Sequence, residues 1–392
     1  MNTKKIYYLD GLRGIAAFIV VIHHLVLAFY PALYNGDREQ SHTSSNLEIY
    51  IANSPLNLVY AGNFSVCIFF VLSGFVLSFK YFSTKNNEII VSSAIRRYFR
   101  LVIPAFFSIF LSFVLMKISL YHNNEAATLS FSPWWLGSFW NFEPSFIGML
   151  IESFYGVFFN EEITYNPVLW TIQIELLGSF LVFLFLLIFG KYKFRWIIYI
   201  LLFITLWNTY YLGFLLGMFL SDLYFSKDIK LKVFKLNLLI KAALFIISLY
   251  LGSYPYSNTD DTIYSIFPKF AFSAEFYHII GAFLLIIFVL ESQRTQRMLN
   301  NKVCIYLGKI SFSMYLIHLL MIGTFSSAFF VFLHSHLQYS LAVIITSLVS
   351  ILIILIVSYP IYKYIDLKGI KISKIISNFI LSKFINKQNK IN

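Results

Sequence analysis

The segment Leu9–His24 reads LDGLRGIAAFIVVIHH and begins a membrane-length apolar stretch near the start of the chain. It carries a fixed cation, Arg13, where it begins and a titratable imidazole, His24, near its middle. An ionisable side chain inside a membrane span is costly to keep, so it marks a functional site by default. The segment therefore predicts both a transmembrane helix and a functional site on that helix.

Helical geometry places the ionisable side chains of this segment along one face. Eleven residues separate Arg13 from His24, so the two side chains differ by about 20° around a helix and about 16 Å along it. Asp10 falls within about 40° of His24, whereas His23 points about 80° away from Arg13. We expect one stripe to run from a cytoplasmic anion-binding group to a catalytic base within the bilayer.

The composition of the whole chain is that of a polytopic membrane protein. Of its 392 residues, 59% are hydrophobic and only 12% are charged. A soluble domain cannot bury so much apolar surface, so we predict an all-α transmembrane bundle of about ten spans with both termini in the cytoplasm. The spans are expected near 11–30, 58–79, 101–121, 168–189, 195–209, 210–226, 237–252, 272–290, 305–331 and 340–362.

The distribution of positive charge sets the orientation. On this topology, 27 of the 30 Lys and Arg residues lie in cytoplasmic segments or at the adjoining ends of spans, and only Arg38, Lys117 and Lys269 lie outside. This is the positive-inside rule. The net charge of +12 is then explained by topology and by attraction to anionic membrane lipid, so we do not expect a nucleic-acid partner.

The chain divides into a membrane domain, 1–362, and a tail, 363–392. Lysines recur among apolar residues in the tail, which we interpret as a basic amphipathic helix on the inner leaflet. The first helix is expected to be retained and not cleaved as a signal peptide. The apolar run 146–159 is short for a full span and contains Glu152, so we interpret it as an interfacial or re-entrant element lining a cavity.

An arginine cluster precedes the third predicted span. Arg97 and Arg100 lie one helical turn apart in the run RRYFR, and guanidinium groups in that arrangement suit phosphate capture. Ordinary positive-inside anchoring explains the cluster equally well.

Two later spans carry polar side chains. Glu175 lies about two turns into the fourth span, after Trp170, and a carboxylate at that depth needs a partner such as His or Arg. A structural hydrogen bond to a neighbouring helix is the alternative. In the ninth span, Ser311, Tyr315 and His318 share one face at i, i+4 and i+7. That stripe either contributes to a site or holds helices together.

Metal sites are not expected. His23 and His24 are adjacent and project in different directions, and Cys67 and Cys304 are far apart in the sequence. They offer neither a metal-ligand set nor a disulfide framework.

Taken in order, these motifs resemble the acyltransferase-3 family of integral membrane acyltransferases, which includes bacterial O-antigen and other glycan O-acetyltransferases. The resemblance rests on five groups: Leu9–Gly14 with His24, Phe69–Phe75 with Ser73, Arg97–Arg100 with Pro104, Leu169–Trp170 with Glu175, and Tyr306–Ser311 with Tyr315 and His318. It implies that Arg13 and His24 are functionally critical and that Arg97 and Arg100 form the family's paired-arginine motif. Ten spans with both ends cytoplasmic also suit the family.

Two features depart from the family's pattern. Thr171 follows Trp170 where the family often has serine, and Leu176 follows Glu175 where a second glutamate is common. Many relatives carry a C-terminal extracytoplasmic esterase-like domain, and we expect none here, because the sequence continues for only about thirty residues after the last predicted span. Transfer is then expected to finish in the membrane domain or to be completed by a separate protein.

The resemblance implies a membrane O-acyltransferase, with acetyl as the expected acyl group. Acetyl-CoA is expected as co-substrate, with no permanently bound cofactor and its phosphates near Arg13, Arg97 and Arg100. His24 would act as general base or as acyl carrier, with Glu175 orienting or neutralising it and Asp10 on the same stripe. The supporting residues are expected to be Ser73, Trp170, Ser311, Tyr315 and His318, with Ser73 or Tyr315 stabilising the oxyanion.

The expected acceptor is a saccharide or lipid-linked glycan, such as O-antigen, approached from the outer side of a bacterial inner membrane. The runner-up is a proton-coupled transporter that uses Arg13, His24 and Glu175. A catalytically silent membrane scaffold is a third reading. The sequence leaves the oligomeric state open, and a homo-oligomer is one option.

Overall fold

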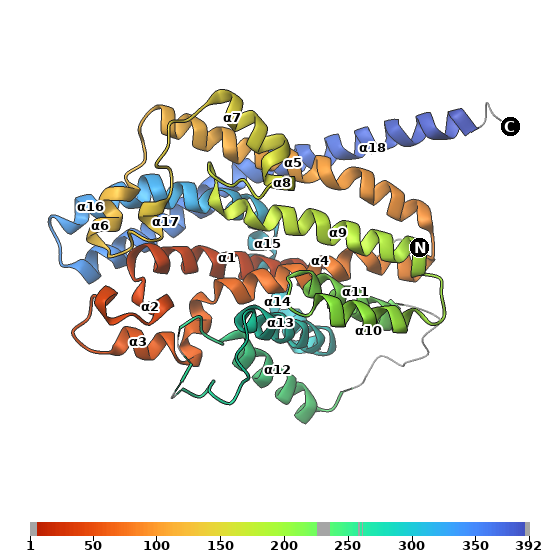
Figure 1. The fold of residues 1–392 in the computed structure, drawn as a ribbon, viewed down its shortest axis with the longest axis horizontal. Helices are drawn as coiled ribbons and strands as arrows, with labels where there is room; N and C mark the ends of the chain where they lie inside the picture. The colour runs from red at the N-terminus through yellow and green to blue at the C-terminus, as the bar shows by residue number, and fades with distance from the viewer. Residues whose placement is uncertain (1–5, 226–235, 258, 261, 389–392) are drawn as a thin grey trace.

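The computed structural model describes residues 6–225, 236–257, 259–260 and 262–388, and it is built from helices (Figure 1). Within those ranges no residue forms a β-strand. Inside a membrane every backbone polar group must be bonded within the protein, and a helix satisfies this within one segment. The predicted all-α fold is confirmed.

Seven long apolar helices form the body of the molecule. They are α1 (Tyr7–Phe29), α4 (Gly62–Thr84), α5 (Asn87–Lys117), α9 (Trp170–Phe189), α13 (Ser273–Glu291), α15 (Lys302–Met321) and α17 (Tyr339–Ile361). Three shorter apolar helices accompany them: α10 (Arg195–Leu206), α11 (Tyr211–Phe225) and α12 (Leu238–Gly252). A helix thus lies at each of the ten predicted spans.

Short helices connect these elements. They are α2 (Ala32–Asn35), α3 (Leu47–Ala52), α6 (Asn123–Leu129), α7 (Phe146–Ile151), α8 (Val157–Phe159), α14 (Gln293–Leu299) and α16 (Ser327–His334). Wide π-turns interrupt three helices: η4 (Glu152–Gly156), η6 (Ile322–Ser326) and η7 (Tyr362–Asp366), and α18 (Leu367–Gln388) follows the last of these. Turns of this kind occur frequently at functional sites.

Helix α5 begins 14 residues before the expected span. The side chain of Asn86 caps it by accepting a hydrogen bond from the backbone N–H of Glu88. The predicted span was bounded by hydrophobicity and therefore began after the arginines, whereas the helix includes them. The arginine cluster therefore lies well inside α5, next to other helices, and not at its entry.

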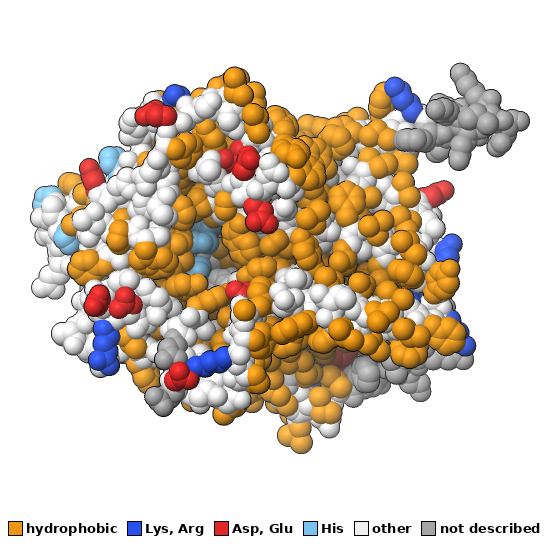
Figure 2. Space-filling model, in the orientation of Figure 1, with side chains coloured by type: hydrophobic (Ala, Val, Ile, Leu, Met, Phe, Trp, Pro, Cys, Tyr) orange, Lys and Arg blue, Asp and Glu red, His pale blue; other side chains and the backbone are white. Residues whose placement is uncertain are grey.

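Two hydrophobic cores meet along α1, which runs through the middle of the molecule (Figure 1). One core joins Val21 and Leu25 to side chains of α5, α9, α15 and α17, and the other joins Leu12 and Val20 to side chains of α4, α11 and α13. Hydrophobic side chains also cover much of the face seen in Figure 2. Soluble monomers rarely expose apolar area on this scale, so we describe the chain as an integral membrane protein.

Two glycines let α1 and α15 pack backbone to backbone. A Cβ at Gly14 would lie 2.4 Å from the backbone nitrogen of Gly308, and one at Gly308 would lie 2.3 Å from the carbonyl oxygen of Asp10. Small residues at such crossings allow membrane helices to approach closely. The contact fixes the relative positions of the two helices that carry His24 and His318.

The segment from α7 to α8 runs along α5, from the level of Phe113 to that of Tyr98. The rings of Phe146 and Phe113 lie 6.1 Å apart, and further along α5 the rings of Phe158 and Tyr98 lie 5.1 Å apart. Tyr98 also donates a hydrogen bond to the carbonyl of Phe154 (2.7 Å). From Phe113 to Tyr98 the segment descends about 22 Å along the helix axis.

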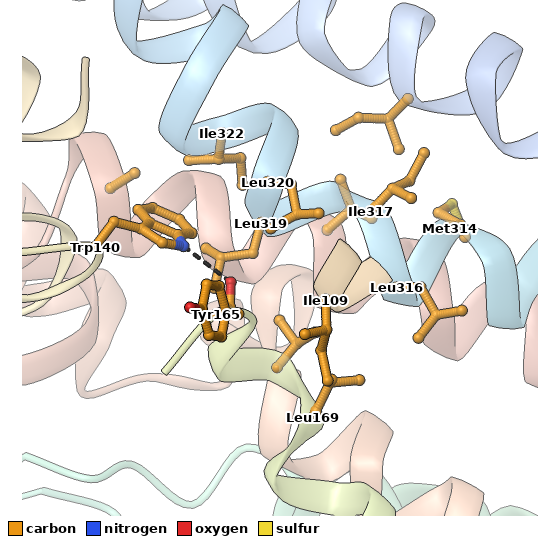
Figure 3. Close-up of a cluster of buried hydrophobic side chains, with 14 of the residues drawn as sticks. Ile109, Trp140, Tyr165, Leu169, Met314, Leu316, Ile317, Leu319, Leu320 and Ile322 are labelled. Carbon is orange, nitrogen blue, oxygen red and sulfur yellow. Dashed lines mark hydrogen bonds between the residues drawn. The ribbon is translucent and has the colours of Figure 1, made fainter. Parts of the chain in front are cut away.

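The chain then returns to the level at which it entered. The Tyr165 carbonyl accepts hydrogen bonds from Ser112 (2.6 Å) and from the Trp140 indole (3.0 Å), and Figure 3 shows the second of these beside α15 side chains of the first core. Glu152 holds the two arms together, since it accepts hydrogen bonds from Thr164 and from the backbone N–H of Tyr165 (3.0 Å). The segment is thus re-entrant in shape, but it does not line the cavity described below.

The last span continues into the tail through the π-turn η7 with no intervening loop. Helix α18 runs along the first half of α5, where Ser377 donates a hydrogen bond to the Ser92 carbonyl (3.3 Å), and its end projects from the body in Figure 1. The boundary between 362 and 363 falls inside η7. A separate tail on the inner leaflet stays a prediction.

Candidate active site

A cavity of about 540 Å³ lies between α1, α4, α5, α9, α15 and η7. Its walls bring together eight of the eleven predicted site residues, namely Asp10, Arg13, Ser73, Arg97, Arg100, Glu175, Ser311 and Tyr315. This volume is in the usual range for a site that binds a small organic ligand.

Each cavity arginine faces one carboxylate. Arg13 lies 3.5 Å from Asp10, and Arg100 lies 3.4 Å from Asp366 in η7. Arg97 pairs more tightly with Glu175. Lys309 of α15 lines the same cavity, which therefore holds four cations and three carboxylates.

The Arg97–Glu175 pair is fixed by further hydrogen bonds. Arg97 donates through Nε to Ser179 (2.7 Å), and Ser73 donates to Oε1 of Glu175 (2.8 Å). Glu175 therefore has an arginine as its partner, one of the two kinds expected from the sequence. A role for Glu175 in orienting His24 stays a prediction. Since its guanidinium is already engaged on two sides, Arg97 is better suited to hold Glu175 than to capture a phosphate.

The inner end of the cavity closes at Tyr315. Its hydroxyl lies 2.7 Å from the Thr171 hydroxyl and donates a hydrogen bond to the Val168 carbonyl, which ties α15 to the start of α9. Tyr315 precedes His318 by three residues, or about 4.5 Å along the helix. The cavity thus ends about one helical turn from the histidines.

His24 and His318 form a direct pair, although 294 residues separate them: Nε2 of His318 lies 2.9 Å from Nδ1 of His24. The carbonyls of Met314 and Val20 lie 3.1 and 3.0 Å from Nδ1 of His318 and Nδ1 of His24. Carbonyls only accept, so both Nδ1 atoms carry protons in the neutral rings, and His318 accepts from His24 through Nε2. The lone pair left for proton transfer is on Nε2 of His24.

The two adjacent histidines have different surroundings. Nδ1 of His23 donates to the Tyr60 carbonyl (2.9 Å), and its ring packs against Gly62. The ring of His24 stacks on Trp135, with centroids 5.5 Å apart. Figure 2 shows histidine side chains at the floor of a hollow on this face, in the half that carries α2 and α6.

Aromatic side chains gather on the outer side of His23. Tyr34 contacts His23 and stacks on both Trp134 and Tyr256. Burial, with a smaller effect of nearby Glu275, raises the pKa of Tyr34 to about 12. Its phenol is therefore neutral at physiological pH and can donate a hydrogen bond.

Three predicted residues occupy places that change their expected roles. Asp10 lies fourteen residues before His24 on α1, or about 21 Å away along the helix, so it cannot assist that imidazole. Trp170 does not line the cavity; its ring packs against that of Tyr210, with centroids 5.4 Å apart. Ser311 lines the cavity, but its hydroxyl donates to the Gly308 carbonyl of its own helix (3.0 Å).

The sequence analysis did not single out Asp366, Lys309 or Ser179 as site residues. Ser179 was recognisable in principle, because it follows Glu175 at i+4 on the same face. Asp366 was assigned to the basic tail, and nothing local linked it to Arg100.

Among the residues that the structure describes, no group of three or more His, Cys, Asp or Glu side chains is placed to hold a metal ion.

Comparisons with known proteins agree with this arrangement. The family model described as Acyltransferase domain (acyltransferase-3) matches residues 6–362. The O-acetyltransferase PaAT-1 of Phomopsis amygdali is 24% identical over 422 residues, which cover 94% of this chain and 83% of that protein. Acyltransferase clz18 of Cochliobolus lunatus is 30% identical over 147 residues, which cover 31% of each chain. No solved structure matches. The chain belongs to the acyltransferase-3 family and is a membrane acyltransferase.

Proposed function

We propose that the protein transfers an acetyl group from cytoplasmic acetyl-CoA to a saccharide hydroxyl on the outer side of the membrane, with His24 as the general base. The observation that carries this proposal is the His24–His318 pair, which orients the His24 ring and leaves its Nε2 as the basic nitrogen. Similarity to an O-acetyltransferase supports acetyl as the acyl group and oxygen as the acceptor atom.

The donor would enter from the cytoplasmic end of the cavity. Its phosphates would contact Arg13, Arg100 and Lys309, since Arg97 is engaged with Glu175. From Ile305 to Tyr315 the cavity follows α15 for ten residues, or about 15 Å. An extended pantetheine arm would follow this path and bring the thioester to Tyr315, next to the histidines.

The chemical step needs one base and no change of oxidation state. Nε2 of His24 takes the proton of the acceptor hydroxyl as that oxygen attacks the thioester carbonyl carbon. The C–S bond then breaks, and the CoA thiolate takes up the proton. The products are the acetyl ester and free CoA, and His24 returns to its neutral state.

The acceptor would approach through the hollow on the outer side. Aromatic rings such as Trp134, which is 43% exposed, offer flat apolar surfaces for sugar rings, and Tyr34 offers a neutral phenol for a hydroxyl. O-antigen or another lipid-linked glycan as acceptor, and a bacterial inner membrane as location, stay predictions from the sequence. Transport has less support, because Arg97 and not His24 is the partner of Glu175.

The test is transfer of radiolabelled acetyl from acetyl-CoA into the glycan fraction of membranes. We expect His24→Ala to lower the rate by about 10²–10⁴-fold, the usual effect of losing a general base. His23→Ala is the matched control and should retain most activity, because His23 bonds the Tyr60 carbonyl on another face. Equal loss in both variants would contradict the assigned base. Label trapped on the protein would identify His24 as an acyl carrier, and unlabelled glycan in wild type would reject the saccharide acceptor or the donor.

A further inference from the structure

Asp366 is a buried carboxylate that makes no strong interaction. It is the last residue of η7, it is 5% exposed, and it lines the cavity next to Arg100. Its Oδ1 atom is buried without a hydrogen bond, and the ion pair with Nη2 of Arg100 spans 3.4 Å. Burying a charge is costly unless it is well paired and hydrogen-bonded, so this arrangement is unfavourable for a purely structural contact.

The surroundings of Arg100 attract anions. Arg13, Arg96 and Arg97 all act on it electrostatically, and Lys309 lines the same cavity. Arg97 keeps its own carboxylate through two further hydrogen bonds, from Arg97 to Ser179 and from Ser73 to Glu175. No comparable hydrogen bonds hold Arg100 and Asp366 together among the described residues. Asp366 contacts Arg100 only through the 3.4 Å ion pair, from the π-turn η7.

We propose that Asp366 pairs with Arg100 until the acyl donor binds, and that a phosphate group of the donor then displaces Asp366 from Arg100. The inference rests on the proposed function, since it requires a phosphate-bearing donor. A phosphate offers a guanidinium two short charge-assisted hydrogen bonds, which the 3.4 Å contact with Asp366 does not. Once displaced, Asp366 repels the bound phosphate.

Asp366 therefore weakens donor binding and favours release of CoA after transfer. It lowers affinity without touching the reacting thioester, which lies at the other end of the cavity. Its removal should lower the KM for acetyl-CoA and leave kcat unchanged or reduced. A residue that only joined η7 to α5 would have the opposite effect on affinity when removed.

The experiment is calorimetric titration of CoA into the purified full-length protein in a non-ionic maltoside detergent. This medium contains no phosphate, so a lipid headgroup cannot be the occupant that is measured. We expect Asp366→Asn to tighten CoA binding by about three- to tenfold, because one competing ion pair is removed. Glu88→Gln is the matched control, since it removes an exposed carboxylate from the same end of α5 and should leave the affinity unchanged.

A second variant, Arg100→Gln, tests whether the tighter CoA binding of Asp366→Asn depends on Arg100. Arg100→Gln should weaken CoA binding, and adding Asp366→Asn to it should then produce no gain. The proposal is overturned if wild type binds CoA and Asp366→Asn binds it equally or less tightly, or if the gain persists without Arg100. It is also overturned if the gain appears only for an anionic lipid added to the detergent. If neither wild type nor Asp366→Asn binds CoA, the donor assigned under the proposed function fails as well.

Discussion

Tyr315 separates the charged cavity from the histidine pair. Its ring centroid lies 5.9 Å from that of His318, and its hydroxyl proton is donated to the Val168 carbonyl. An oxyanion would need that same proton, so the hydrogen bonds of Tyr315 support a closing role and not the expected oxyanion role. In the proposed reaction closure matters, because water that reached the thioester would compete with the acceptor.

Tyr315→Phe should raise hydrolysis of acetyl-CoA in the absence of acceptor. The ring remains, but the bonds to Thr171 and Val168 are lost, which weakens the closed state by about 0.5–1.5 kcal/mol per hydrogen bond. We expect about two- to tenfold faster release of free CoA thiol, measured with a thiol reagent. Tyr306→Phe, on the exposed side of the same helix, is the control. Unchanged hydrolysis together with a hundredfold loss of transfer would instead indicate a proton donor.

At the scale of elements, the α1–α15 crossing aligns the two histidines. The helices touch through Gly14 and Gly308, one backbone against the other. His318 lies ten residues after Gly308 and His24 ten residues after Gly14, so the two helices reach the histidine pair at the same distance from their crossing. Any change in the crossing is therefore transmitted to the Nε2–Nδ1 contact.

Gly308→Ala should both destabilise the protein and disturb the histidine pair. The added Cβ would lie 2.3 Å from the Asp10 carbonyl oxygen, so the helices must separate. Overpacking of this kind costs about 1–3 kcal/mol, and a shift of about 1 Å at a reacting group costs about 10²-fold in rate. Thermal unfolding in detergent and acetyl transfer measure the two effects. Gly369→Ala is the control, because its Cβ would meet its nearest neighbour at 3.6 Å; a similar loss there would reject the explanation.

At the scale of the whole molecule, the cavity and the hollow open on opposite sides of the protein. The cavity mouth lies among cationic residues near the start of α1 and the end of α17, whereas the hollow lies in the half that carries α2 and α6 (Figure 2). The histidine pair lies between the two. Under the proposed function, this arrangement would let the donor and the acceptor meet without either crossing the membrane.

Orientation can be tested with Glu88, in the first turn of α5, and Glu125, beyond the other end of that helix. In a Cys304→Ser background, Glu125→Cys should react with a membrane-impermeant maleimide in intact cells, whereas Glu88→Cys should react only after permeabilisation. Both side chains are exposed and α5 separates them, while the positive-inside rule puts Glu88 in the cytoplasm. Cys67 remains in this variant, but it is buried, so it should react little with the maleimide. Labelling of both sites from the same side would contradict the predicted topology.

The sequence by itself determined the helices, their membrane character and the stripe from Arg13 to His24. These properties are local: apolar runs partition into lipid, each helix bonds its own backbone, and the 3.6-residue period places side chains on faces. The contrast between His23 and His24 followed from that period alone, and the structure places the two rings against different partners.

Only the tertiary structure decided which polar groups pair. His318 reaches His24 across 294 residues, Arg97 takes Glu175 from α9, and Asp366 faces Arg100 from a turn assigned to the tail. A buried charge accepts whichever partner the packing brings near it, and that choice depends on helix crossings such as Gly14 with Gly308. The start of α5 and the re-entrant path were decided in the same way, by contacts between segments and not by the hydrophobicity of either one.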